Sequence, residues 1–299
     1  MGATELRGWL LLTVLAALYV SSVAKADAQT PATTATGSSP PAAQVSGEAA
    51  RTDLQHRVDA FVRAVTRSSG SADEDSLVRW NAPICLLVAG LGAEDVKVVS
   101  ARLSQIGSFA GAPLARSPCQ ANFIVVATSE PDRVLDAWYA RDSHLFGDAP
   151  PAHIRQFLEG SQSRPVLVWY NVDSGRKAGM RNGHFVPSDT QGDSSSFNAH
   201  AVLGFSSIVA IIDTQRTAHA TLDQLAAYVA MTGLTQVDLD ADLGSAPSIL
   251  RLFAPSAESH PSGLSTWDTA FLRALYRSNP TSRTQRFEIA ERVAHDLSR

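Results

Sequence analysis

The chain of 299 residues has few of the features from which a function is usually inferred. It has only two cysteines, lysine is scarce, and the formal net charge is -4 with an isoelectric point near 6.0. The positive field that draws proteins onto nucleic acid is therefore missing, and we expect no nucleic-acid partner. Beyond the N-terminal region no apolar run is long enough to span a bilayer, so we expect no later membrane span.

Motifs for common catalytic and cofactor sites are missing as well. No H-E-x-x-H occurs, and the eight histidines lack the spacing of zinc ligands. Gly90-Leu91-Gly92 lacks the third glycine of a dinucleotide-binding turn and the lysine of a phosphate-binding loop. The segment 204–208, Gly-Phe-Ser-Ser-Ile, lacks the second glycine of a serine-hydrolase elbow. We therefore expect no cofactor, and the sequence favours a protein that is not an enzyme.

One acidic stretch has part of the pattern of a calcium loop. Asp238, Asp240 and Asp242 alternate as calcium ligands do, and Gly244 follows them. The glycine comes one position late, the intervening residues are apolar, and Ile249 stands where the closing glutamate belongs. We expect a solvated turn here, with a calcium site as the alternative.

The first 26 residues have the layout of a secretory signal peptide. Arg7 precedes an apolar run at 9–24, and Ala24-Lys25-Ala26 has the small-x-small pattern of a cleavage site. An uncleaved membrane anchor is the alternative interpretation of the same run. In either case we expect the protein to act outside the cytoplasm, in the periplasm or as a secreted protein.

Composition divides the rest of the chain into three parts. Residues 27–50 are mostly Ala, Thr, Ser, Pro, Gly and Gln and predict a disordered linker. Residues 51–75 contain an N-terminal helix, because apolar side chains recur at helical spacing from Leu54 to Val65. Residues 78–299 are expected to form a single α+β domain.

Cys85 and Cys119 are each next to a predicted strand. In an oxidising compartment an even number of cysteines favours a disulfide bond between them. Two buried free thiols are the alternative. A catalytic thiol is disfavoured, because neither residue has a helix start or a histidine beside it to lower its pKa.

The predicted domain has a mixed sheet and a helical C-terminal part. Apolar runs predict strands at 84–89, 123–127, 165–171 and 207–212. Helical spacing predicts helices at 94–109, 131–140 and 152–158. The first strand, helix and strand form one unit, which indicates two parallel strands. The polar segment 173–198 predicts an exposed loop or hairpin insertion.

Three further helices are expected to begin at capping boxes, in which two side chains satisfy the free amides of the first turn. The pairs are Thr221 with Gln224, Ser265 with Asp268, and Ser282 with Gln285. Gly233 is expected to end the first of these helices.

Several residues of the C-terminal third carry a resemblance to a known family. They are the strand at 208–212, the capped helix ending in Gly233-Leu234, Pro247-Ser248-Ile249, Leu264, Trp267-Asp268, Phe271-Leu272 and Leu275-Tyr276. This part of the chain resembles an uncharacterised family of exported bacterial proteins with a zincin-like fold, that is, one built like the zinc metallopeptidases. In such families the helix before the Gly-Leu carries the H-E-x-x-H motif, and a unit like 84–127 precedes it.

The resemblance places alanines at the zinc-binding positions. Counting back from Gly233, the two histidine positions fall on Ala226 and Ala230, and the glutamate position falls on Ala227. Methyl groups neither bind zinc nor transfer protons, so the resemblance implies a catalytically silent member of the family. The alternative is that these alanines belong to the buried stripe of an ordinary helix.

These absences lead to a functional expectation. We expect a non-catalytic, pseudo-peptidase-like exported domain that binds a protein, a peptide or an envelope component, with the polar segment 173–198 as a candidate surface. The alternative is a metallopeptidase-like hydrolase whose active site the motifs do not reveal.

Overall fold

The computed structural model of the chain describes residues 41–66, 77–141, 143–160, 164–173, 178–181, 184–187, 202–254 and 260–299. The predicted signal peptide at 1–26 lies outside these residues, as do most of the predicted linker and most of the polar segment 173–198. In the part that is described, no helix combines the length and the apolar character needed to cross a membrane. Residues Val45–Arg299 form one compact unit.

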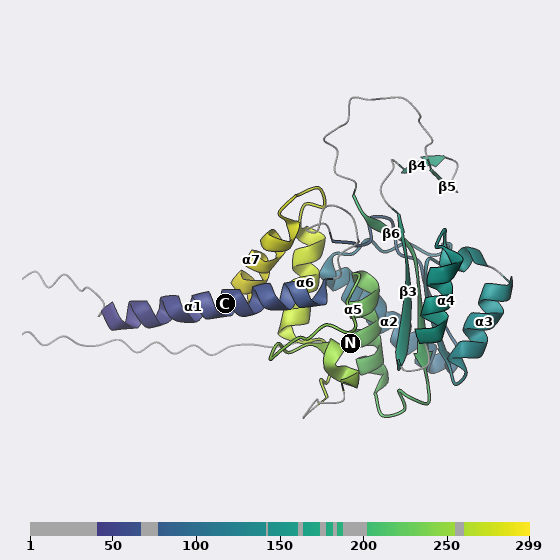
Figure 1. Ribbon diagram of the computed structural model, residues 1–299, viewed down its shortest axis with the longest axis horizontal. Helices are drawn as coiled ribbons and strands as arrows, with labels where there is room; N and C mark the ends of the chain where they lie inside the picture. The colour runs from purple at the N-terminus through teal and green to yellow at the C-terminus, as the bar shows by residue number, and fades with distance from the viewer. Residues whose placement is uncertain are drawn as a thin grey trace, which may run out of the picture. The chain divides into compact units, whose positions relative to one another are not determined.

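A four-stranded mixed sheet forms the centre of this unit (Figure 1). In spatial order its strands are β1 (Leu86–Ala89), β2 (Phe123–Thr128), β6 (Gly204–Asp213) and β3 (Val166–Asp173). The first three are parallel, and β3 runs antiparallel to β6. The predicted mixed sheet and α+β class are therefore confirmed, including the parallel pair in the first strand-helix-strand unit.

Helices cover both faces of the sheet (Figure 1). One face carries α2 (Ala93–Ala110) and α5 (Leu222–Leu234), and the other carries α3 (Pro131–Arg141), the short helix η1 (Ser143–Phe146) and α4 (Pro151–Gly160). Successive side chains of a strand point to opposite faces, so a strand buried on both faces must be apolar throughout. This explains the unbroken apolar run of β6, whose side chains alternate between the two core clusters.

The helical C-terminal part packs on the side of α2 and α5. It consists of η3 (Ile249–Phe253), α6 (Thr266–Arg277) and α7 (Gln285–Leu297). The N-terminal helix α1 (Pro41–Val65) joins the same core, because the ring of Phe61 meets the Trp267 ring edge-on with 5.4 Å between centroids. The second half of α1 is thus held by burial of its apolar face.

Helix α1 begins at Pro41, within the segment 27–50 whose composition predicts a linker. Residues 47–53 are exposed, so this part of the helix buries little apolar surface. The composition of this stretch agrees with the lack of a buried apolar face. Several of its residues are alanines, which have the highest helix propensity and favour a helix even without burial.

Part of the polar segment 173–198 forms a hairpin. Strands β4 (Ala178–Arg181) and β5 (His184–Pro187) pair antiparallel in a separate two-stranded sheet. This agrees with the predicted hairpin alternative for the segment.

Two of the three predicted capping boxes are present, and the third prediction is wrong. Both hydrogen bonds of the box form at Thr221 and at Ser265. Helix α7 instead begins after Thr284, which makes no side-chain cap bond. Gln285 is fully buried, where its Oε1 accepts from the Leu77 amide at 2.9 Å and its Nε2 donates to Ser278 at 3.0 Å. These tertiary bonds replace the local pairing that the spacing predicts.

Helix α5 ends at Leu234, one residue beyond the stop predicted at Gly233, and Thr235 follows with extended backbone. A Cβ atom on Gly233 would lie 2.0 Å from Cζ of Phe123. The glycine therefore serves the packing of α5 onto that ring, a role that depends on a strand more than 100 residues away in the chain.

The predicted disulfide bond is confirmed. Cys85, just before β1, is bonded to Cys119, before β2, with 5.9 Å between the two Cα atoms. The bond closes a loop that contains helix α2.

Replacing both Cys85 and Cys119 by serine should lower the free energy of unfolding by roughly 3 to 4 kcal/mol, the chain-entropy estimate for a loop of this length. Urea titration of the variant and of the parent protein measures the difference. The parent protein with its disulfide reduced is the matched control and should unfold at the same urea concentration as the variant. An unchanged midpoint in both samples would contradict the prediction.

Candidate functional site

The alanines at the positions assigned to zinc ligands are core residues. Ala226, Ala227 and Ala230 lie on α5 and are between 0 and 1% exposed. Ala230 also lines a small apolar cavity next to the sheet. Their methyl groups pack in the main hydrophobic cluster, where they offer no lone pair to a cation.

The described part of the chain contains no group of three or more His, Cys, Asp or Glu residues that could hold a metal ion. In the acidic stretch each carboxylate has another partner. Asp238 accepts from the amide of Asp240 at 3.0 Å, and Asp242 accepts from that of Gly244 at 2.8 Å. Asp240 forms an ion pair with Arg164, with 2.5 Å between Oδ2 and Nη2. The stretch has the solvated turns that the sequence analysis expects.

Other candidates from the sequence also take structural roles. Ser206 and Ser207 lie in β6, where both bond to Asn171 of β3. Among the histidines whose side chains are described, only His219 and His260 lie together, with 5.7 Å between ring centroids. A serine nucleophile paired with a histidine is therefore not formed at segment 204–208.

Two buried charged side chains hold helix α6. The guanidinium of Arg79 donates to the carbonyl groups of Leu275 and Ser278 at the end of the helix. Burial lowers the pKa of Arg79, and the nearby Tyr276 raises it. At the other end the carboxylate of Asp268 accepts from backbone amides. These charged side chains provide hydrogen-bond partners for backbone groups at the two ends of α6.

The outer edge of β1 has the features of a binding site. Phe123 N–H on β2 donates to Cys85 O at 3.1 Å. Hydrogen bonds alternate along a strand, so Cys85, Leu87 and Ala89 direct their backbone groups to β2, and Leu86 and Val88 direct theirs outward. The outward N–H and C=O groups of Leu86 and of Val88 have no hydrogen-bond partner among the residues that the structure describes.

The chain itself occupies the start of this edge. The Ile84 amide donates to Pro113 O at 2.7 Å, and Ile84 O accepts from the amide of Ala115 at 2.8 Å. The segment 113–115 thus pairs in parallel with the residue before β1 through a single isolated bridge, Ile84 with Leu114. The hydrogen bonds of segment 113–115 with this edge end at Ile84. The next residue whose backbone groups point outward is Leu86, and it remains unpaired. Val88 is 8% exposed, which makes Leu86 the accessible position.

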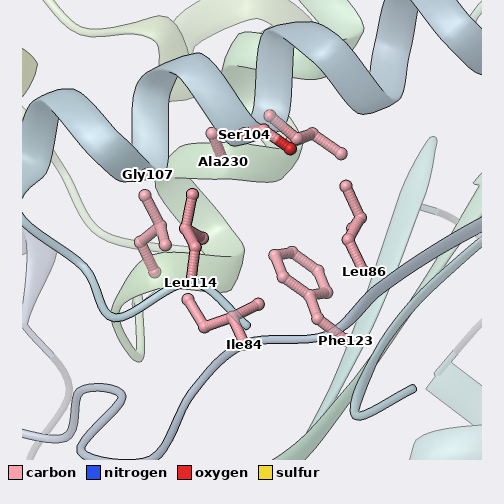
Figure 2. A pocket seen from close by; sticks show the side chains of 9 residues that line it. Ile84, Leu86, Ser104, Gly107, Leu114, Phe123 and Ala230 are labelled. Atoms are coloured by element: carbon pink, nitrogen blue, oxygen red, sulfur yellow. The ribbon is translucent and has the colours of Figure 1, made fainter. Parts of the chain in front are cut away.

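An apolar cavity of about 20 Å³ lies beside this open edge (Figure 2). It is lined by Ile84, Leu86, Leu103, Ser104, Gly107, Leu114, Phe123, Ala230 and Leu234. Figure 2 shows Leu86 and Phe123 rising from the strands toward Ser104 and Ala230 on the helices. Ser104 is exposed at the rim, and no charged side chain contributes to the lining.

Gly107 gives the cavity its shape. A Cβ atom there would lie 3.2 Å from Cδ2 of Leu114, so the glycine allows the leucine to lie close to α2. Leu114 and Leu87 are 37 and 46% exposed, and they place apolar surface on both sides of the edge. Unpaired backbone groups beside apolar side chains are the features that an added strand uses.

This arrangement has the features for binding an extended chain, and among the described lining residues the one polar side chain is that of Ser104. The edge could not be predicted from the sequence, because the apolar run 84–89 predicts a strand without showing that the strand lies at an edge. The exposure of Leu87 marks the edge only once the fold is known.

Comparisons of the chain with protein-family models, with curated protein sequences and with solved structures found no match.

Proposed function

We propose that the protein is an exported, non-catalytic domain that binds an extended peptide segment of another protein along the outer edge of β1. The observation that carries the proposal is the edge at which Ile84 is paired and Leu86 is not. A peptide strand that continues the line of segment 113–115 gains backbone hydrogen bonds from Leu86, as in other cases of strand addition.

The cavity next to Leu86 supports a selectivity for small apolar side chains. Side chains on one face of an added strand would point toward α2, where the cavity of about 20 Å³ lies. That volume is about the size of one methyl group and too small for an aromatic ring. We therefore expect alanine at the matching position of the peptide.

Export is the second part of the proposal. The signal-peptide pattern of residues 1–26 supports it. The disulfide bond between Cys85 and Cys119 is compatible with an oxidising compartment outside the cytoplasm. These two features together support a location in the periplasm or in the medium.

The alternative, a metallopeptidase-like hydrolase, derives from the resemblance in the C-terminal third. Placing Ala226 and Ala230 at the histidine positions argues against zinc binding by α5. Metal analysis of the purified protein separates the two hypotheses. Stoichiometric zinc, or peptidase activity that a chelator removes, would favour the hydrolase.

Leu86→Pro should weaken peptide binding while the domain stays folded. Of the hydrogen-bonding groups in the sheet, proline removes only the outward N–H of Leu86, which has no partner there, and its ring blocks the approach of an added strand. It also removes the part of the cavity wall that the leucine side chain forms. Binding is measured on an array of eight-residue peptides with alternating apolar residues, in which one position varies from alanine to tryptophan. We expect at least a roughly tenfold loss of affinity.

Leu86→Ala is the matched control, because it keeps the N–H and removes only part of the cavity wall. It should retain most of the binding, and both variants should melt as cooperatively as the parent protein. Equal binding by Leu86→Pro and the parent protein, or no binding of any peptide by the parent protein, would refute strand addition at β1.

A further inference from the structure

A second cleft lies away from the β1 edge, beside the ion pair of Arg164 and Asp240. It has a volume of about 620 Å³, within the range of small-ligand sites. The start of β3, helix α5, the loop 238–244 and η3 contribute to it. Its lining residues are Arg164, Pro165, Val166, Tyr228, Leu239, Asp240, Ala241, Asp242, Leu243, Gly244, Leu250, Arg251, Phe253 and Ala254.

Tyr228 is the residue that points to a ligand. Its side chain is 7% exposed and meets the ring of Phe253 edge-on, with 5.0 Å between centroids. Its hydroxyl group has no hydrogen-bond partner among the described residues, and it is not one of the buried atoms left without a partner, so its oxygen is accessible from the cleft. Because Tyr228 lines the cleft, the partner of this hydroxyl is water or a ligand in the cleft.

Two partly buried tyrosines of the same region show the usual arrangement. The hydroxyl of Tyr170 donates to Thr232 O at 2.8 Å, and that of Tyr276 donates to Leu234 O at 2.7 Å. Both serve carbonyl groups at the end of α5. Tyr228, on the same helix, differs from them in facing a cleft with its hydroxyl unused.

The hydroxyl of Tyr228 is a donor at neutral pH. Burial raises the pKa of Tyr228 to about 12, while Arg164 lowers it and Asp240 raises it. Arg164 and Asp240 line the same cleft as Tyr228.

The polar wall carries balanced charge. Arg164 is paired with Asp240, and Arg251 donates from Nη1 to Gly244 O at 2.6 Å. Each guanidinium has five N–H donors, so both retain donors for a ligand. Asp242 uses Oδ1 to accept from the amide of Gly244 and keeps its second oxygen. Two cationic and two anionic groups thus face one cleft.

The remaining wall is apolar. It is formed by Val166, Leu239, Leu243, Leu250 and Phe253. A simple anion or cation would meet like charge in this cleft, whereas a molecule with both charges finds a partner for each. An apolar side chain on that molecule would contact the leucines and Phe253.

We propose that this cleft binds a short zwitterionic peptide of two or three residues with apolar side chains. Its carboxylate accepts from Tyr228 and Arg251, and its ammonium group donates to Asp242. This site is separate from the β1 edge, and neither proposal depends on the other.

Isothermal titration of the purified protein with the dipeptide Leu-Leu tests the proposal. Acetyl-Leu-Leu lacks the ammonium group and Leu-Leu amide lacks the carboxylate, so each should bind at least tenfold more weakly than the free dipeptide. Tyr228→Phe should weaken Leu-Leu about tenfold, as expected for a hydrogen bond to a charged group. It should leave the thermal midpoint of the free protein unchanged, because the hydroxyl has no protein partner.

Tyr139→Phe, on α3 at the opposite face of the sheet, is the matched control and should bind Leu-Leu as the parent protein does. Leu86→Pro should also bind Leu-Leu normally, which separates this site from the β1 edge. The proposal is overturned if Leu-Leu does not bind at millimolar concentration, or if the blocked dipeptides bind equally well. Full affinity of Tyr228→Phe would overturn it too, and would leave the cleft with water only.

Discussion

Replacing Gly90 by alanine is expected to cost more than about 4 kcal/mol of stability, enough to leave little folded protein. Gly90 ends β1 with a φ of 85°, where a side chain strains the backbone. A Cβ atom on Gly90 would also lie 1.9 Å from the carbonyl oxygen of Ala127 on β2. That oxygen belongs to the backbone of a paired strand, so it has no room to move away.

Gly92, two residues later, provides the control. Its φ is -60°, and a Cβ atom there would approach nothing closer than Oδ2 of Asp95 at 3.7 Å. Gly92→Ala should therefore change the unfolding free energy by less than about 1 kcal/mol. Urea titration of both variants, followed by far-ultraviolet circular dichroism, gives the comparison. A cooperative, parent-like transition of Gly90→Ala would show that the close approach to Ala127 is misjudged.

Asp268→Ala is expected to lose about 5 kcal/mol, because two buried donors and one partly buried donor lose their acceptor together. The carboxylate accepts from the Ser248 hydroxyl at 2.6 Å, from the Ile249 amide at 2.8 Å and from the Ser265 amide at 2.9 Å. It therefore caps α6 and fixes the start of η3. Burial raises the pKa of Asp268, and hydrogen bonds from Ser248, Ser265 and Ile249 oppose that rise.

Asp268→Asn tests whether acceptors or charge matter at this position. One amide oxygen can accept from both backbone amides, because Oδ2 alone does so in the parent protein. The amide NH₂ can donate to Ser248, whose hydroxyl oxygen is also an acceptor. The asparagine variant should therefore lose less than about 2 kcal/mol in the same urea titration. Equal losses for alanine and asparagine would contradict the hydrogen-bond explanation.

Much of the fold could be predicted, because its elements are encoded locally. Each strand of the main sheet contains a run of apolar residues, and the capping boxes at Thr221 and Ser265 mark the starts of α5 and α6. The pairing of Cys85 with Cys119 followed from having only two cysteines. These signals lie within a few residues of the structure that they predict, or depend on a simple count.

The errors occurred where a distant contact decides the role of a residue. Gly233 has the sequence context of a helix stop, but the ring of Phe123 requires glycine there. Gln285 has the spacing of a capping box, but its side chain forms hydrogen bonds with Leu77 and Ser278 instead. Periodicity and spacing contain no information about such partners.

Neither candidate site could be predicted from the sequence, and the reason is the same for both. The β1 edge depends on strand order and on segment 113–115 pairing only as far as Ile84. The second cleft gathers Arg164, Tyr228 and Arg251 from three different elements. No motif joins these residues, and the fold alone brings them together.

The most direct test of strand addition is amide hydrogen exchange at Leu86, measured by nuclear magnetic resonance with and without the best peptide from the array. In the free protein the Leu86 amide should exchange quickly, while that of Leu87, which faces β2, should be protected. Saturating peptide should slow exchange at Leu86 at least tenfold and leave Leu87 unchanged. A bound peptide that leaves the Leu86 amide exchanging at its free rate would contradict binding along β1.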